Sequence, residues 1–196
     1  MISQPGGHKG SAGYTANMHI RRILCWLLGG WIGASLFMFV VATQNFRSVD
    51  RLLASPAGLV AIEQSGLNRD PARMLLRYQV SEQNRWYFET WEQTQFALAG
   101  ALLLAAMADL RGYRVGLLAG AVLVAILAAE RWYLTPEIVR LGRALDFSPA
   151  AQASAERTQF WRLHGAYSTL EVAKVLLLLG MSVGLVRRGR EERSAL

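Results

Sequence analysis

Charged and polar side chains interrupt otherwise apolar stretches of this 196-residue chain. The residues concerned are Glu89, Glu92, Gln95, Glu130, His164, Ser168, Glu171 and Lys174. His164, Ser168 and Glu171 stand at i, i+4 and i+7, a spacing that places them on one face of a helix. Ionisable groups in apolar segments are costly unless they are paired or hydrated, so these positions are the candidates for binding an ion or a small polar ligand.

One chemistry that fits this set is metal binding. Carboxylates and an imidazole are ligand types of carboxylate-rich metal sites in helical bundles, which makes Glu89, Glu92, Glu130 and His164 the candidate metal ligands. Such sites usually carry Glu-x-x-His pairs, and this sequence has none. A metal-dependent membrane enzyme is therefore the third of three alternatives.

A second chemistry is ion or ligand binding in a hydrated layer, where proton titration of Glu171 beside Lys174 could drive a conformational step. The remaining interpretation is a structural role, because Glu171 and Lys174 stand at i and i+3 and can form an ion pair. In that interpretation the acids pair with basic neighbours and hold the helices together; these neighbours are Arg85, Arg131, Arg162 and Lys174. We favour the structural role, and with it a non-enzymatic accessory or interaction protein over a transporter.

Other catalytic signatures are missing from the sequence. A single cysteine, Cys25, excludes a disulfide framework and any multi-cysteine metal site. Only His164 is a plausible ligand among three histidines, which excludes haem held by a histidine pair within one chain. There is no P-loop, dinucleotide fingerprint or Ser/His/Asp arrangement, so we predict no catalytic residue and no cofactor.

Four apolar segments must position these residues. The chain is 53% hydrophobic and only 18% charged, below the charge content of ordinary soluble domains. Residues 23–43 carry no charge, and at ~1.5 Å per residue they span a bilayer core of ~30 Å. The other segments are shorter and continue into polar helices. We predict an all-α integral membrane four-helix bundle with helices two to four extended beyond the bilayer on the non-cytoplasmic side, and spans at about 23–43, 90–108, 114–133 and 164–186.

Boundary signals divide the chain further. Residues 109–114 form a polar turn between helices two and three, and Pro136 predicts a kink or break in helix three. An amphipathic stretch at 49–53 predicts short surface helices between the first two spans. Residues 1–17 are predicted to be a disordered tail, unless translation starts at Met18, followed by a single domain over 18–190 and a polar tail at 191–196.

The polar residues are predicted to lie at similar heights along their helices. Measured from the predicted cytoplasmic end of each span at ~1.5 Å per residue, Gln95, Glu130 and Glu171 all lie at a height of ~24 Å, and Lys174 lies at ~20 Å. His164 and Glu89 lie higher, near ~33 Å, at the outer interface. The sequence therefore predicts a polar layer near the outer leaflet where the helices converge. A separate G-x-x-x-G pattern, Gly116 to Gly120, predicts a helix–helix contact.

The net charge of +7 concerns the membrane rather than nucleic acid, because the basic residues flank the apolar segments. One side carries Lys9, Arg21, Arg22, Arg111, Arg114, Arg187, Arg188, Arg190 and Arg193. The positive-inside rule then places both termini in the cytoplasm, and the predicted location is the bacterial inner membrane as a multi-pass protein. The expected partners are the lipid bilayer and either another membrane protein or a second copy of the chain.

The last helix carries a family resemblance. Phe160, His164, Gly165 and Ser168 match an aromatic residue, a His-Gly pair and a serine four residues after the histidine. This pattern resembles the fourth-helix signature of the small four-helix membrane domain typified by the eukaryotic transmembrane protein 205. Glu171 stands where that signature has an asparagine, so a role that rests on a neutral amide there does not carry over.

The first helix resembles the same family. Trp31-Ile-Gly33 followed by Phe37 and Phe39 is similar to the family's opening Trp-x-Gly and aromatic pattern, and the architecture agrees over roughly residues 20–187. The resemblance implies a four-span integral membrane protein. It brings no catalytic residue and no substrate, because the bacterial members are of unknown function.

Overall fold

Helices account for all the regular secondary structure that the computed structural model describes, which covers residues 9–108, 113–148 and 154–194. The elements are α1 (Lys9–Ala54), α2 (Pro56–Ser65), α3 (Arg69–Ala108), α4 (Tyr113–Ala129), the π-helical turn η1 (Glu130–Leu134), α5 (Thr135–Leu145) and α6 (Ala155–Ser194). The all-α prediction is confirmed for this part of the chain.

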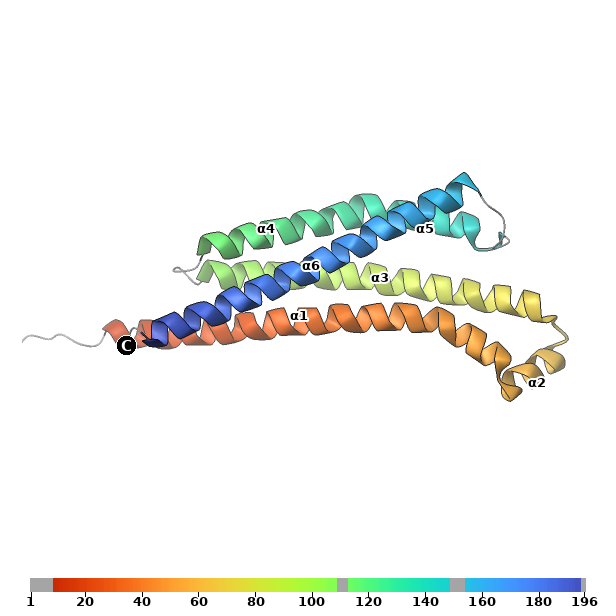
Figure 1. Cartoon of the computed structure of the whole chain (residues 1–196), viewed down its shortest axis with the longest axis horizontal. Helices are drawn as coiled ribbons and strands as arrows, with labels where there is room; N and C mark the ends of the chain where they lie inside the picture. The colour runs from red at the N-terminus through yellow and green to blue at the C-terminus, as the bar shows by residue number, and fades with distance from the viewer. Residues whose placement is uncertain (1–8, 109–112, 149–153, 195–196) are drawn as a thin grey trace, which may run out of the picture.

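The long helices run up and down side by side, as Figure 1 shows. α1 packs against α3 and α6, α3 packs against α4, and both α4 and α5 pack against α6. We call the end that holds the start of α1, the end of α3, the start of α4 and the end of α6 the terminal end. The opposite end, with α2 and α5, is the distal end.

Three helices are long and apolar enough to cross a membrane. They contain the stretches Met18–Ala54, Val115–Leu145 and Ala155–Arg190. Large apolar side chains point outward along them, including Trp26 (82% exposed), Phe39 (73%) and Leu118 (69%). Apolar surface of this extent is typical of contact with lipid, so the fold indicates an integral membrane protein. α3 is not among the three, because Glu92, Gln93 and Gln95 interrupt the apolar part of its predicted span.

In the described part of the chain, the larger hydrophobic core is formed by six leucines, two tryptophans and one alanine from all four long helices. Trp31 of α1 is 1% exposed, and Leu102, Leu127 and Leu178 contribute from α3, α4 and α6. The predicted G-x-x-x-G contact is confirmed, because a Cβ added at Gly120 would lie 2.4 Å from Leu103 Cδ2 of α3. The absence of a side chain at position 120 therefore leaves room for the Leu103 side chain between α3 and α4.

Two predicted boundaries change. α1 begins at Lys9, so residues 9–17 continue the first helix instead of forming a disordered tail, while residues 1–8 lie outside the described residues. α6 continues to Ser194, so most of the predicted C-terminal tail is helical. Residues 109–112 of the predicted turn also lie outside the described residues. Hydrogen bonding of the helical backbone continues past the apolar segments at both ends, which hydropathy alone does not reveal.

The amphipathic stretch at 49–53 is the end of α1 rather than a separate surface helix. Val49 and Leu53 are buried and pack with Ala72 of α3. A tight corner then leads into α2, where the Ser55 Oγ accepts a hydrogen bond from the Gly58 N–H at 3.0 Å. A Cβ at Gly58 would lie 1.9 Å from the Leu52 carbonyl oxygen, so this corner requires glycine.

The predicted kink at Pro136 takes the form of a π-helical turn. η1 covers Glu130–Leu134, and the Thr135 N–H donates to the Glu130 carbonyl five residues earlier. Proline has no N–H to donate and crowds the preceding turn, and a widened turn just before it accommodates that defect. The helix then continues to Leu145 without a break, and Glu130 and Thr135 both come to lie in the interior.

Candidate functional site

Lys174 is the centre of a buried polar cluster in the middle of the molecule. Its side chain is 1% exposed. The Nζ atom donates to Glu130 Oε2 at 2.5 Å, to Gln95 Oε1 at 2.6 Å and to Glu171 Oε1 at 3.0 Å. An ammonium group has three hydrogens to donate, so Lys174 is saturated by acceptors on α3, η1 and its own helix α6.

Gln95 forms hydrogen bonds with both Lys174 and Glu171. Its Oε1 accepts from Lys174, and its Nε2 donates to Glu171 Oε1 at 3.1 Å. Gln95 is fully buried, whereas the Glu171 side chain is 21% exposed at the edge of the cluster. The amide therefore ties α3 to α6 beside the ion pairs.

Glu92 forms the second part of the cluster and is also fully buried. The Thr135 hydroxyl donates to Glu92 Oε1, and Arg131 Nη1 lies 3.5 Å from Glu92 Oε2. Arg131 is 33% exposed in its side chain, so one end of this pair reaches the surface. We use the name buried polar cluster for Glu92, Gln95, Glu130, Arg131, Thr135, Glu171 and Lys174.

The charges in the buried polar cluster do not balance. When all groups are ionised, the carboxylates of Glu92, Glu130 and Glu171 face only the cations Lys174 and Arg131. Glu130 Oε1 is buried and accepts no hydrogen bond from any described residue, and Glu92 Oε2 has only the ion pair with Arg131 at 3.5 Å. Buried polar atoms without a partner cost free energy, so this arrangement has room for one more positive charge, such as a proton.

Five of the eight predicted site residues meet in this cluster: Glu92, Gln95, Glu130, Glu171 and Lys174. Gln95, Glu130 and Glu171, which residue counting puts at the same height, all accept a hydrogen bond from Lys174. Glu89 is exposed and lies outside the cluster, as do His164 and Ser168. The Ser168 hydroxyl donates to the His164 carbonyl of its own helix at 2.8 Å.

His164 belongs to an aromatic group instead. Its ring stacks on Phe160, with centroids 5.7 Å apart and planes at 13°, and meets the edge of Trp161 at the same distance. The predicted metal ligands Glu89, Glu92, Glu130 and His164 are therefore not assembled. No group of three or more His, Cys, Asp or Glu side chains in the described ranges could hold a metal ion.

Two buried residues are absent from the set predicted by sequence: Thr135, which belongs to the buried polar cluster, and Tyr167, which lies beside Glu171. Tyr167, Glu171 and Lys174 stand at i, i+4 and i+7, so the helical spacing that selected Ser168 selects Tyr167 equally well. Thr135 stands five residues after Glu130, which does not match an α-helical face. The π-helical turn brings Glu130 and Thr135 to the interior together, and Pro136 is the sequence signal that indicates such a turn.

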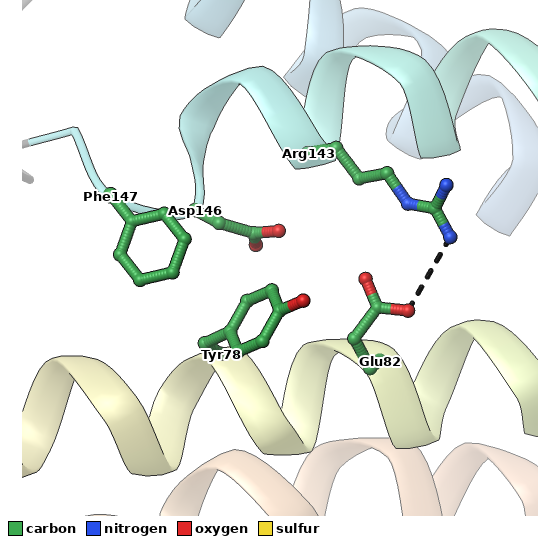
Figure 2. A pocket seen from close by; sticks show the side chains of 5 residues that line it. All are labelled: Tyr78, Glu82, Arg143, Asp146 and Phe147. Atoms are coloured by element: carbon green, nitrogen blue, oxygen red, sulfur yellow. Dashed lines mark hydrogen bonds and ion pairs between the residues drawn. The ribbon is translucent and has the colours of Figure 1, made fainter.

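A second set of ion pairs lies toward the distal end and joins α3 to α5. Arg85 Nη2 donates to both carboxylate oxygens of Asp146, at 2.8 and 2.9 Å, and Arg85 also pairs with Glu82. Figure 2 shows the ion pair between Glu82 and Arg143, whose Nη2 lies 3.4 Å from Glu82 Oε2. These two side chains line a cavity of about 440 Å³ together with Tyr78, Asp146 and Phe147. The sequence predicts that Arg85 pairs with the acids of the polar layer, whereas the structure pairs it with Glu82 and Asp146. Neither this cavity nor an apolar groove between α4 and α6 is lined by the buried polar cluster.

Comparison of the chain with protein families, with curated proteins and with solved structures finds no match. The resemblance of the last helix to the transmembrane protein 205 domain therefore stays a prediction. Any function assigned to this chain depends on its own geometry.

Proposed function

We propose that the protein crosses the membrane four times, with α3 as the remaining span. α1 and α4 run in the same direction from the terminal end (Figure 1), so a chain that crosses in both must return between them. α3 makes that return and packs against both. Its polar residues Glu92 and Gln95 face the interior and have partners there, which offsets the cost that excludes such residues from a lipid-facing helix.

Cysteine labelling tests this topology. The only native cysteine, Cys25, is replaced by serine, and single cysteines are placed at Ser65 in α2 and at Ala108 at the end of α3. We expect an impermeant maleimide to label Ser65→Cys in intact cells and Ala108→Cys only after the cytoplasmic side is opened. Labelling of both from the same side would contradict a crossing by α3. The expected orientation, with both termini in the cytoplasm, follows from the basic flanks of the spans.

We propose further that the protein has a non-enzymatic role, as an accessory or interaction protein, and that the buried polar cluster fixes how its helices pack. The observation that carries this proposal is the saturation of Lys174 by three acceptors from different elements. A polar group inside an apolar interface selects the one helix arrangement in which it has partners. The lack of a cavity lined by the cluster, among the cavities described, agrees with this role.

The test compares assembly with ligand binding in one apolar double variant, Glu130→Leu/Lys174→Met. Replacing both members of a buried ion pair by apolar groups is often nearly neutral for stability. If the cluster fixes helix packing, the purified variant should stay folded but lose its single helix arrangement, seen as faster hydrogen exchange in α3 and α6, while native mass spectrometry shows the same bound molecules as the wild type. A folded, fully assembled variant that has lost one bound ion or small molecule would contradict the packing role.

A second candidate function is proton or monovalent-cation binding, and the unbalanced charge of the cluster supports it. Glu130 Oε1 lacks a hydrogen-bond partner in the described part of the chain, and Glu92 Oε2 has only Arg131, 3.5 Å away. The three carboxylates of the cluster outnumber its two cations, so one bound proton or monovalent cation would balance the charge. Infrared spectroscopy should then show a protonated carboxyl band at neutral pH that disappears in Glu130→Gln or Glu92→Gln. A spectrum without such a band, together with a melting temperature that is the same in sodium, potassium and choline salts, would refute ion binding.

A further inference from the structure

An apolar groove opens at the terminal end between α4 and α6. It has a volume of about 570 Å³, within the range of small-molecule sites. Leu24 and Leu28 of α1 and Leu102 of α3 line it, together with Ala119 of α4 and residues of α6 from Ala173 to Arg188. Arg188 is the only charged residue among the lining residues.

The groove exists because α6 diverges from α4 and crosses toward α1, as Figure 1 shows. Small residues keep the resulting space open. No atom lies within 4 Å of a Cβ added at Gly180 or Gly184, both of which line the groove. An occupant can therefore lie directly against the backbone of α6.

The polar end of the groove is positively charged. Besides Arg188, the Arg21 guanidinium reaches α6 from α1, where its Nη1 lies 3.8 Å from a Cβ added at Gly189. At this end the described helices carry eight basic residues, Lys9, Arg21, Arg22, Arg114, Arg187, Arg188, Arg190 and Arg193, against the acids Glu191 and Glu192. A ligand that is complementary to both the apolar groove and its basic end needs a hydrocarbon chain and an anionic head group.

We propose that the groove binds an acyl chain of an anionic phospholipid, with the phosphate near Arg188 and Arg21. This inference rests on the proposed membrane topology, because the basic end then lies at the level of the cytoplasmic head groups, where anionic lipids attract Lys and Arg. A second copy of the chain fits less well. In a two-fold dimer across this groove with both copies in the same membrane orientation, the arginine-rich ends would face each other and repel.

The experiment reconstitutes the full chain in vesicles with equal amounts of phosphatidylglycerol and phosphatidylcholine, extracts it in mild detergent, and identifies retained lipid by native mass spectrometry. We expect one phosphatidylglycerol per chain. Arg188→Gln should lower its bound fraction about five-fold, the value of one basic residue at a membrane surface. Gly180→Leu should abolish retention because the leucine side chain fills the groove.

Gly33→Leu serves as the matched control. Gly33 lies on a helix face with no atom within 4 Å of an added Cβ and does not line the groove, so this variant should retain the lipid. Equal retention of both lipids by the wild type would overturn the proposal, as would unchanged retention in Gly180→Leu or a dimer mass in place of a lipid adduct. Failure of the proposed topology is a separate result, since it would appear as labelling of Ser65→Cys and Ala108→Cys from the same side of the membrane.

Discussion

Removing the positive charge of Lys174 is the most direct test of the buried polar cluster. In Lys174→Met the side chain keeps its length and apolar contacts, but three hydrogen bonds are lost and Glu130 becomes a fully buried carboxylate without a cation. Glu171 is 21% exposed in its side chain and can recover water, so Glu130 dominates the cost. Loss of one partner of a buried pair costs ~3–5 kcal/mol, and we expect the free energy of unfolding to fall by that amount.

The double variant Glu130→Leu/Lys174→Met should recover most of this loss, to within ~1–2 kcal/mol of the wild type, because it removes the uncompensated charge and leaves mainly the Gln95 amide short of a partner. The double-mutant cycle should therefore give a coupling energy above ~2 kcal/mol. The assay is reversible unfolding in mixed detergent micelles followed by tryptophan fluorescence, for which the chain has six tryptophans.

Arg140→Met provides the matched control, since the Arg140–Glu137 pair is also an ion pair within one helix but is largely exposed. Exposed pairs contribute little, so this variant should unfold like the wild type. A loss of less than ~1 kcal/mol in Lys174→Met would refute the reasoning, and so would a double variant no more stable than the sum of the single losses. Either result would mean that Glu130 is already neutral in the folded protein.

Three further predictions concern packing. Gly120→Leu should cost ~1–3 kcal/mol of unfolding free energy and separate α3 from α4, because its Cβ overlaps the Leu103 side chain; a melting temperature equal to that of the wild type would contradict this contact. Gly58→Ala should prevent the α1–α2 corner from forming, seen as protease cleavage after residue 54, and an intact, protease-resistant variant would show that the corner tolerates a side chain. Arg85→Lys should weaken the α3–α5 connection by ~1–3 kcal/mol, because a lysine cannot hold Glu82 and Asp146 in the same geometry; hydrogen exchange in α5 should rise, and unchanged exchange would argue against the role of this pair.

Much of the arrangement can be predicted from patterns in the sequence. Apolar length predicts the helices that can cross a membrane, and counting at a fixed rise per residue brings Gln95, Glu130 and Glu171 to one level. This works because a helix converts residue number into height with little variation. Counting residues does not determine which face of a helix points inward. Each residue turns the helix by about 100°, so the i, i+4, i+7 spacing on α6 fits both His164, Ser168 and Glu171 and Tyr167, Glu171 and Lys174. The structure selects the set containing Tyr167, whereas Ser168 points outward.

Other features had no signal that sequence reasoning could use. α1 and α6 extend beyond their apolar segments because backbone hydrogen bonding continues through polar residues, and composition does not mark where it stops. The chemistry of its imidazole makes His164 a candidate ligand, yet its ring packs against Phe160 and Trp161, at i−4 and i−3 on the same helix. Side-chain packing of this kind depends on which way a helix faces, and the residue type alone does not determine it.

The π-helical turn determines where the chain can lose a residue. A turn that closes over five residues instead of four contains one residue more than a regular helix of the same height. Deleting one residue there, such as the 72%-exposed Trp132, would remove that extra residue and let the backbone close as a regular helix, with Glu130 and Thr135 still on one face. Leu141, which is fully buried, would keep its orientation, and the cost would be that Pro136 again crowds a regular turn. A deletion of one residue beyond the turn, within α5, would instead rotate everything after it by about 100° and turn Leu141 out of the interior.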